Sequence, residues 1–135
     1  MVSRTFTRFA LMTGLAMFGS IAVLAGAPAS APDPVKVDPK HYKVVFENDQ
    51  VRVLRITYGP HEKSVMHSHP AGVLVTLGDS KITMTTPDGK TSESVLKAGT
   101  ASWAEATTHL PENKSAKPAG ENILVELKTK PAAAK

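Results

Sequence analysis

The stretch GVLVTLGDSKITMTTPDGKTSESVL, residues 72–96, contains three short segments whose apolar signal repeats every two residues. This period is typical of β-strands that bury one face. Gly78 and Asp79 supply a turn signal after the first segment, and Pro87 to Lys90 form a hairpin turn before the third. The stretch therefore predicts three consecutive β-strands.

Further strands are predicted on both sides of this stretch, and segments with a helical period are hard to find. The additional strand segments are residues 42–46, 51–58, 100–106 and 123–127. Seven or eight short strands separated by turns every 8 to 12 residues or so favour a sandwich or a barrel. We therefore expect a single all-β domain over residues 42–127.

The composition bounds the chemistry of this domain. The chain has 135 residues, a formal net charge of +4 and no cysteine. Without cysteine there is no disulfide framework, zinc ribbon, iron-sulfur cluster, thiol nucleophile or lipid-anchored cysteine. Any metal site must therefore use nitrogen and oxygen ligands.

The first 29 residues have the pattern of a secretory signal peptide. Arg4 and Arg8 are the only charges in the first 32 residues, and residues 9–27 are almost wholly apolar or small. An Ala-x-Ala end places cleavage after Ala29, with Ala31 as the alternative site. We favour cleavage over a retained anchor because glycines interrupt the apolar stretch and no basic flank follows it. The expected location is periplasmic or secreted, with no stable membrane anchor after cleavage.

Two flanking segments have compositions that differ from the domain. Residues 30–41 are rich in Pro and Ala and predict an extended linker, and residues 128–135 predict a flexible tail.

Removal of residues 1–31 leaves 14 basic and 12 acidic residues, a net charge of +2, because the two arginines are the only charges lost. No Lys or Arg run is interleaved with aromatic residues, which disfavours nucleic-acid binding.

His67 and His69 are the first candidates for a binding site. Residues i and i+2 of a strand point to the same face, so this pair presents two imidazoles to one ion. A pair of solvated loop histidines beside Pro70 is the alternative interpretation of the same residues.

Two ordered motifs resemble those of the cupins. In residues 59–69 a glycine precedes His-x-His, as in the first cupin motif, and Gly78 closes the following turn. In residues 99–113 a glycine opens a strand, and His109 is followed, after three intervening residues, by an asparagine, as in the second motif. The resemblance implies a small antiparallel jelly-roll β-barrel, in agreement with the strand pattern.

The resemblance also implies a divalent metal held by His67, His69 and His109. Where the family places its metal-binding glutamate, this chain has Val73 or Leu74, so no fourth protein ligand is assigned. Three neutral imidazoles leave coordination positions open for water, oxygen or a substrate. The implied ions are iron(II), zinc, manganese or nickel.

Other residues are secondary candidates. His61 and Glu105 would support the metal-binding histidines from outside the ligand set. The alternative for each is an ordinary solvent-exposed surface residue. Val73 and Val75 share the parity of the paired histidines if no bulge intervenes, which would place them on the pocket wall. Trp103 would line the same pocket, with core packing as its alternative.

The sequence and the resemblance together predict an exported single-domain cupin with a three-histidine pocket that binds a divalent metal and takes a small-molecule ligand or substrate. A dioxygenase or an isomerase is one reading of its activity, and a non-catalytic binding or structural module is the other. The sequence leaves open whether the protein is an enzyme, because the cupin barrel supports many activities. A homodimer formed through sheet edges is a further expectation.

Overall fold

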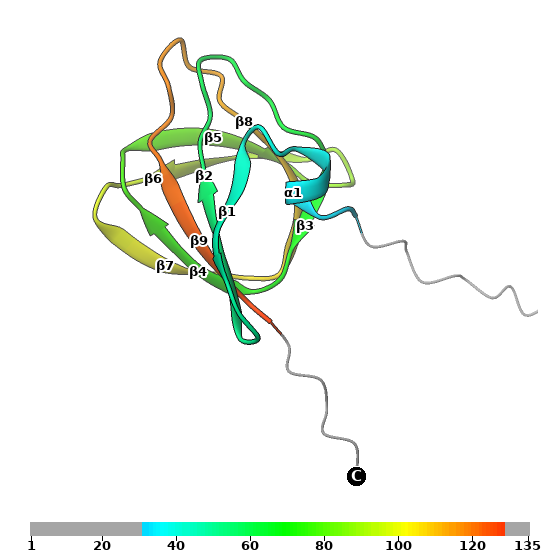
Figure 1. Cartoon of the computed structure of the whole chain (residues 1–135). Coiled ribbons are helices and arrows are strands. Elements are labelled where there is room, and N and C mark those ends of the chain that lie inside the picture. The colour runs from blue at the N-terminus through cyan, green and yellow to red at the C-terminus, as the bar shows by residue number, and fades with distance from the viewer. Residues whose placement is uncertain (1–30, 129–135) are drawn as a thin grey trace, which may run out of the picture.

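Two antiparallel β-sheets make up most of the computed structural model, which describes residues 31–128 (Figure 1). The five-stranded sheet has the order β1 (Tyr42–Glu47), β2 (Val51–Ile56), β9 (Asn122–Leu127), β4 (Gly72–Thr76) and β7 (Thr100–Ala104). The four-stranded sheet has the order β3 (His67–His69), β8 (Thr107–Glu112), β5 (Ser80–Thr85) and β6 (Thr91–Leu96). The predicted all-β jelly-roll class is confirmed.

Two strands were missed by the sequence analysis. The segment predicted over residues 100–106 ends at Ala104, and β8 then begins at Thr107 in the other sheet. β8 contains Pro111 and lacks regular apolar alternation, and β3 has only three residues. Neither strand has the alternating pattern of a half-buried strand. They form because β3 pairs with β8 and β8 also pairs with β5, and such long-range pairing leaves no signal in the local sequence.

The core lies between the two sheets. Its buried cluster contains Tyr42, Leu54, Ile56, Tyr58 and Leu124. The even-numbered positions of β2 and β9 face inward, and the register places Leu54 opposite Leu124. This alternation packs the apolar side chains of one sheet against the interior of the barrel.

The linker expected over residues 30–41 contains an ordered helix. α1 (Pro34–Val37) lies beside β1 and β3 (Figure 1). Pro34 is buried. Asp33 caps the helix by accepting a hydrogen bond from the Val35 N–H at 2.9 Å. An Asp-Pro pair is a helix start signal, because Asp caps the N-terminus and Pro suits the first turn. The composition argument overlooked this local signal.

The predicted leader and most of the predicted tail lie outside the described residues. In the part of the chain that the structure describes, no helix has the length and apolarity needed to cross a membrane. The backbone N–H of Lys128, the last described residue, donates to the carbonyl of Gln50 at 2.8 Å.

Gly72 is required where β4 meets β9. A Cβ atom at this position would lie 2.2 Å from the carbonyl oxygen of Val125, which belongs to the paired strand. We expect Gly72→Ala to lower the free energy of unfolding by about 1–3 kcal/mol, because the backbone must shift to make room. Urea denaturation measures this change.

Gly89 provides the matched control. It has a φ of 82° in the β5–β6 turn, and an added Cβ would meet nothing within 4 Å. Asn tolerates this conformation, so Gly89→Asn should change the free energy of unfolding by less than about 0.5 kcal/mol. Equal effects of the two substitutions would contradict the steric argument.

Candidate metal centre

The antiparallel pairing of β3 with β8 brings three histidines together. His67 lies directly opposite His109, and His69 follows on the same face of β3. One ring nitrogen from each histidine lies within 4.8 Å of the other two. The ring centroids are 4.8–5.4 Å apart, and His67 and His69 are buried. The three residues predicted from the two motifs therefore converge at one point of the barrel.

The hydrogen bonds of His67 and His69 define which ring nitrogen is free. Nδ1 of His67 lies 2.7 Å from the carbonyl oxygen of Val65, and Nδ1 of His69 lies 2.6 Å from Oε1 of Glu126. A carbonyl or an ionised carboxylate only accepts, so each Nδ1 carries the proton. Both Nε2 atoms then present lone pairs, and these two atoms are 3.1 Å apart. Two facing lone pairs repel each other, whereas a shared cation would be bound by both.

His109 adds a third donor to this point. Its Nε2 is buried and has no hydrogen-bond partner among the described residues. Burial, together with the neighbouring His69 and His67, lowers the pKa of His109 to about 3. Burial is also the main cause that lowers the pKa of His67. These two rings are therefore neutral near pH 7, the form in which imidazole binds a metal.

A carboxylate behind His69 was not predicted from the sequence. Glu126 is buried on β9, and its Oε2 accepts a hydrogen bond from Nε of Arg52 at 2.6 Å. Arg52 also donates through Nη1 to Asp33 at 2.5 Å. Burial by itself raises the pKa of Glu126, but the hydrogen bonds from His69 and Arg52 outweigh it and lower the pKa. Glu126 is therefore an anion that fixes the tautomer and the orientation of the His69 ring.

A second chain of polar contacts ends at His67. Ser64 donates to Oδ2 of Asp38 at 2.5 Å, and its Oγ lies 3.4 Å from Nδ1 of His67. Asp38 also bonds to Nδ1 of His41 at 2.7–2.8 Å, and all four residues are buried.

α1 supplies a carboxylate to each of these two chains. Asp33 is its N-cap and begins the contacts that reach His69, and Asp38 is its C-cap and begins those that reach His67. The backbone continues this support, because the N–H of Ser68 donates to the carbonyl of Pro32 at 3.0 Å. The segment expected to be a linker therefore braces two of the three histidines.

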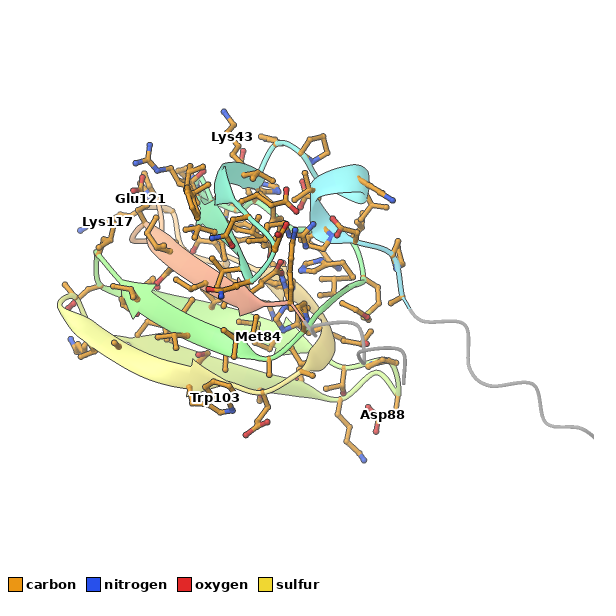
Figure 2. The ribbon with its side chains drawn as sticks, turned by 60° about the horizontal axis from the view of Figure 1, so that its bottom comes forward. Lys43, Met84, Asp88, Trp103, Lys117 and Glu121 are labelled. Carbon is orange, nitrogen blue, oxygen red and sulfur yellow. The ribbon has the colours of Figure 1, made fainter. Side chains whose placement is uncertain are left out.

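A cavity of about 100 Å³ lies in front of the histidines. His69 and His109 form part of its wall, and most of the rest is apolar, including Leu74, Ile82 and Met84. Figure 2 shows the side chain of Met84 in the space between the sheets. The cavity is small beside ligand pockets of about 300–1,000 Å³, which limits it to small molecules.

The predicted pocket walls are corrected by the structure. Leu74 lines the cavity, whereas Val73 and Val75 lie on the opposite face of β4. The parity argument failed because Pro70 and the following residue separate β3 from β4, and the two strands belong to different sheets.

Trp103 is also outside the cavity. Its side chain lies on the outer side of β7 (Figure 2), and the residue is 54% exposed. Its Nε1 donates to Oε1 of Glu105 at 2.8 Å. Neither core packing nor a role in the pocket wall describes this tryptophan.

The two predicted supporting residues do not contact the histidine rings by hydrogen bonds. His61 is exposed, and its backbone, with a φ of 55°, donates to the carbonyl of Ser115. Glu105 is exposed at the rim of the cavity and is bonded to Trp103. Glu126 has the supporting position instead. Its signal in the sequence was a charged residue at an inward position of the strand ILVEL, where burial requires a partner.

A jelly-roll barrel in which two sequence motifs supply the clustered histidines is the arrangement of the cupin fold. Comparison with solved structures supports the same fold. A cupin domain from Bordetella pertussis Tohama I is similar with a TM-score of 0.59 and 23% identity, over 65% of this chain and 92% of that one. A protein with a double-stranded β-helix domain from Klebsiella pneumoniae has a TM-score of 0.51 and 18% identity, over 68% and 82%. No family model and no curated protein sequence matches the chain. The domain therefore has the cupin fold that the motifs predicted.

The buried histidines should make the metal-free protein sensitive to acid. The pKa values of His67 and His109 are lower in the folded chain than the ordinary value of 6.5, so the unfolded chain binds more protons below that pH. The free energy of unfolding should therefore fall as the pH drops below 6.5. His109, whose pKa in the folded chain is about 3, contributes up to about 1.4 kcal/mol per pH unit down to about pH 5, and His67 adds to the fall in the same direction. Urea denaturation of chelator-treated protein at several pH values measures this slope.

Substitution of His109 by Gln should reduce the slope, because one of the two groups is removed. His61→Gln is the control, since the exposed His61 lies outside the cluster, and it should leave the slope unchanged. A slope that is the same in all three proteins would show that the cluster does not govern the acid response.

Proposed function

We propose that His67, His69 and His109 bind one divalent metal ion through Nε2. The observation that carries this proposal is the convergence of three imidazoles beside an apolar cavity: the Nε2 atoms of His67 and His69 are 3.1 Å apart, and the buried Nε2 of His109 has no partner among the described residues. Such a donor set suits iron(II), zinc, manganese or nickel, whereas calcium and magnesium prefer oxygen ligands. Three protein ligands leave room for exchangeable ligands on the cavity side.

The proposed activity is chemistry on a small molecule beside this metal. Three neutral ligands leave the charge of a divalent ion uncompensated, which favours a substrate with an anionic or carbonyl oxygen. The bound metal would supply Lewis-acid polarisation of that oxygen or, as iron(II), reactivity toward dioxygen. We therefore propose a metal-dependent dioxygenase or isomerase of a small substrate.

Residues of the chain would hold the ligands and exclude water. The ring of Tyr42 packs against His67 and His69, with centroid distances of 4.7 and 5.4 Å, which restricts both imidazoles. Its hydroxyl is 2.6 Å from that of Tyr58, and both tyrosines line the cavity. Burial raises the pKa of Tyr42, and it raises that of Tyr58 to about 12, so both remain protonated donors.

Capture of a small molecule without turnover is the second candidate function. It is favoured by the lining of the cavity, because Glu105 at the exposed rim is the only carboxylate among the described lining residues. The double variant His67→Ala/His69→Ala distinguishes the two functions. Metal content and turnover should both be lost if the site is catalytic, whereas ligand binding should survive if the barrel only captures its ligand.

Export to the periplasm or the medium is part of the proposal. Its support is the pattern of residues 1–29, which lie outside the described residues. The carbonyl of Pro32 already takes part in the fold, close behind the two predicted cleavage sites. The intact mass of protein recovered after expression with its own leader tests this, and an uncleaved chain would contradict it.

Elemental analysis of protein purified without a histidine tag tests the metal site. About one divalent ion per chain is expected, and His109→Gln should lose it because one of three ligands is removed. His61→Gln should retain the ion. Absence of metal from the wild-type protein, even after incubation with iron(II), zinc, manganese and nickel, would refute the site.

Glu126 should tune the affinity of this site. Glu126→Gln removes the negative charge behind His69 while nearly preserving the shape of the side chain, so metal affinity should fall about 10–100-fold. Competition with a chromophoric chelator measures the affinity without any activity assay. Glu105→Gln, at the exposed rim, should change it less than twofold. Equal losses in the two variants would contradict the assigned role of Glu126.

A further inference from the structure

The outer face of the five-stranded sheet is mostly apolar, with the charged pair Lys43 and Arg55 beside Ile123 at one corner. Even-numbered residues of β4 and β9 face the cavity, so the odd-numbered ones face outward. These outward residues are Val73, Val75, Ile123, Val125 and Leu127. An antiparallel sheet with one solvated face normally alternates apolar and polar side chains. The central strands of this sheet have branched apolar side chains on the outside instead.

The register extends this surface across the whole sheet. Phe46 on β1 is opposite Val53, which is opposite Val125, and Val125 is opposite Val73, which is opposite Trp103 on β7. One unbroken apolar row thus crosses all five strands, which we name the outer apolar row. Its two aromatic ends, Phe46 and Trp103, are each 54% exposed.

The second sheet of the same chain provides an internal comparison. On β5, Ile82 and Met84 line the cavity, and Lys81 and Thr85 alternate with them on the outer face, where Thr83 between them is buried. Their neighbours on β6 include Thr91 and Glu93. This outer face is mostly polar, as expected for a face in water, so the apolar character of the other face is specific to it.

We propose that a second copy of this chain covers the outer apolar row. The sheet order places β9 third of five strands, with Phe46 and Trp103 at opposite edges. A two-fold axis parallel to β9 would therefore lay Phe46 of each copy against Trp103 of the other. The row is complementary to itself under this rotation, which is the requirement for a symmetric dimer.

The size of the face fits this occupant. Five strands spaced about 4.8 Å apart, each of five or six residues at about 3.3 Å per residue, present a projected area of about 400 Å². The accessible area exceeds the projection because the side chains stand out from the sheet. Two copies would thus bury on the order of 1,000 Å², the size at which specific interfaces begin. This face-to-face dimer differs from the edge pairing expected from the sequence.

Trp103 reports directly on this contact, because it is the only tryptophan in the chain. The protein, expressed with its own leader and purified without a tag, is examined by light scattering and tryptophan fluorescence across a dilution series. The expected result is a dimer whose dissociation shifts Trp103 emission to longer wavelength with the same midpoint. A protein that stays monomeric at all concentrations up to about 0.1 mM would overturn the proposal. The outer apolar row would then be expected to contact a different protein or a lipid surface.

Variants locate the interface. Val73→Thr/Val125→Thr keeps β-branched side chains and should raise the dimer dissociation constant by at least about tenfold, because four hydroxyl groups enter the interface. Val95→Thr is the matched control, at an exposed position of the other sheet, and should leave it unchanged. Near-ultraviolet circular dichroism verifies that each variant is folded.

Two outcomes would place the dimer elsewhere and overturn the proposal. One is a dissociation constant that Val73→Thr/Val125→Thr leaves unchanged in the folded protein. The other is a mass transition during which Trp103 emission stays constant. Both readouts are independent of metal content, so they do not depend on the proposed function.

Discussion

The antiparallel pairing of three-residue strand β3 with β8 is the constraint on which the candidate metal centre depends. It sets His67 opposite His109 and places His69 on the same face, so two segments far apart in the sequence supply three nitrogens at one point. The pairing is short, and it is held by contacts outside the two strands. The backbone of Pro32 bonds to Ser68 on the edge of β3 that faces away from β8.

The buried and half-buried polar groups behind the histidines form two continuous chains. Asp33, Arg52 and Glu126 lead to His69, and Asp38 and Ser64 lead to His67. Buried ionic groups do not by themselves stabilise a fold, because desolvation offsets their attraction. When every partner is satisfied, however, such a network fixes side-chain orientation. Here the orientation that it fixes is that of the ring nitrogens facing the cavity.

Local patterns explain how much could be predicted from the sequence. Alternation revealed the longer strands, and the two motifs identified His67, His69 and His109, which the fold brings together. The alternation of inward and outward side chains in β3 could not be extended past Pro70 to Val73 and Val75, because β3 and β4 belong to different sheets. Glu126 was missed because its role depends on Arg52 of β2 and His69 of β3 both reaching its carboxylate on β9, a tertiary fact that spacing does not encode.

The order of the strands along the chain has a consequence for when the candidate metal centre is assembled. The polar chain that supports His69 begins at Asp33 and ends at Glu126 on β9, the last strand. The complete coordination environment therefore forms only when nearly the whole domain has folded. A partly synthesised or unfolded chain offers scattered histidines with no geometric preference. For the proposed metal site, this means that the histidines converge to bind an ion only in the completed fold, and not during synthesis of the chain.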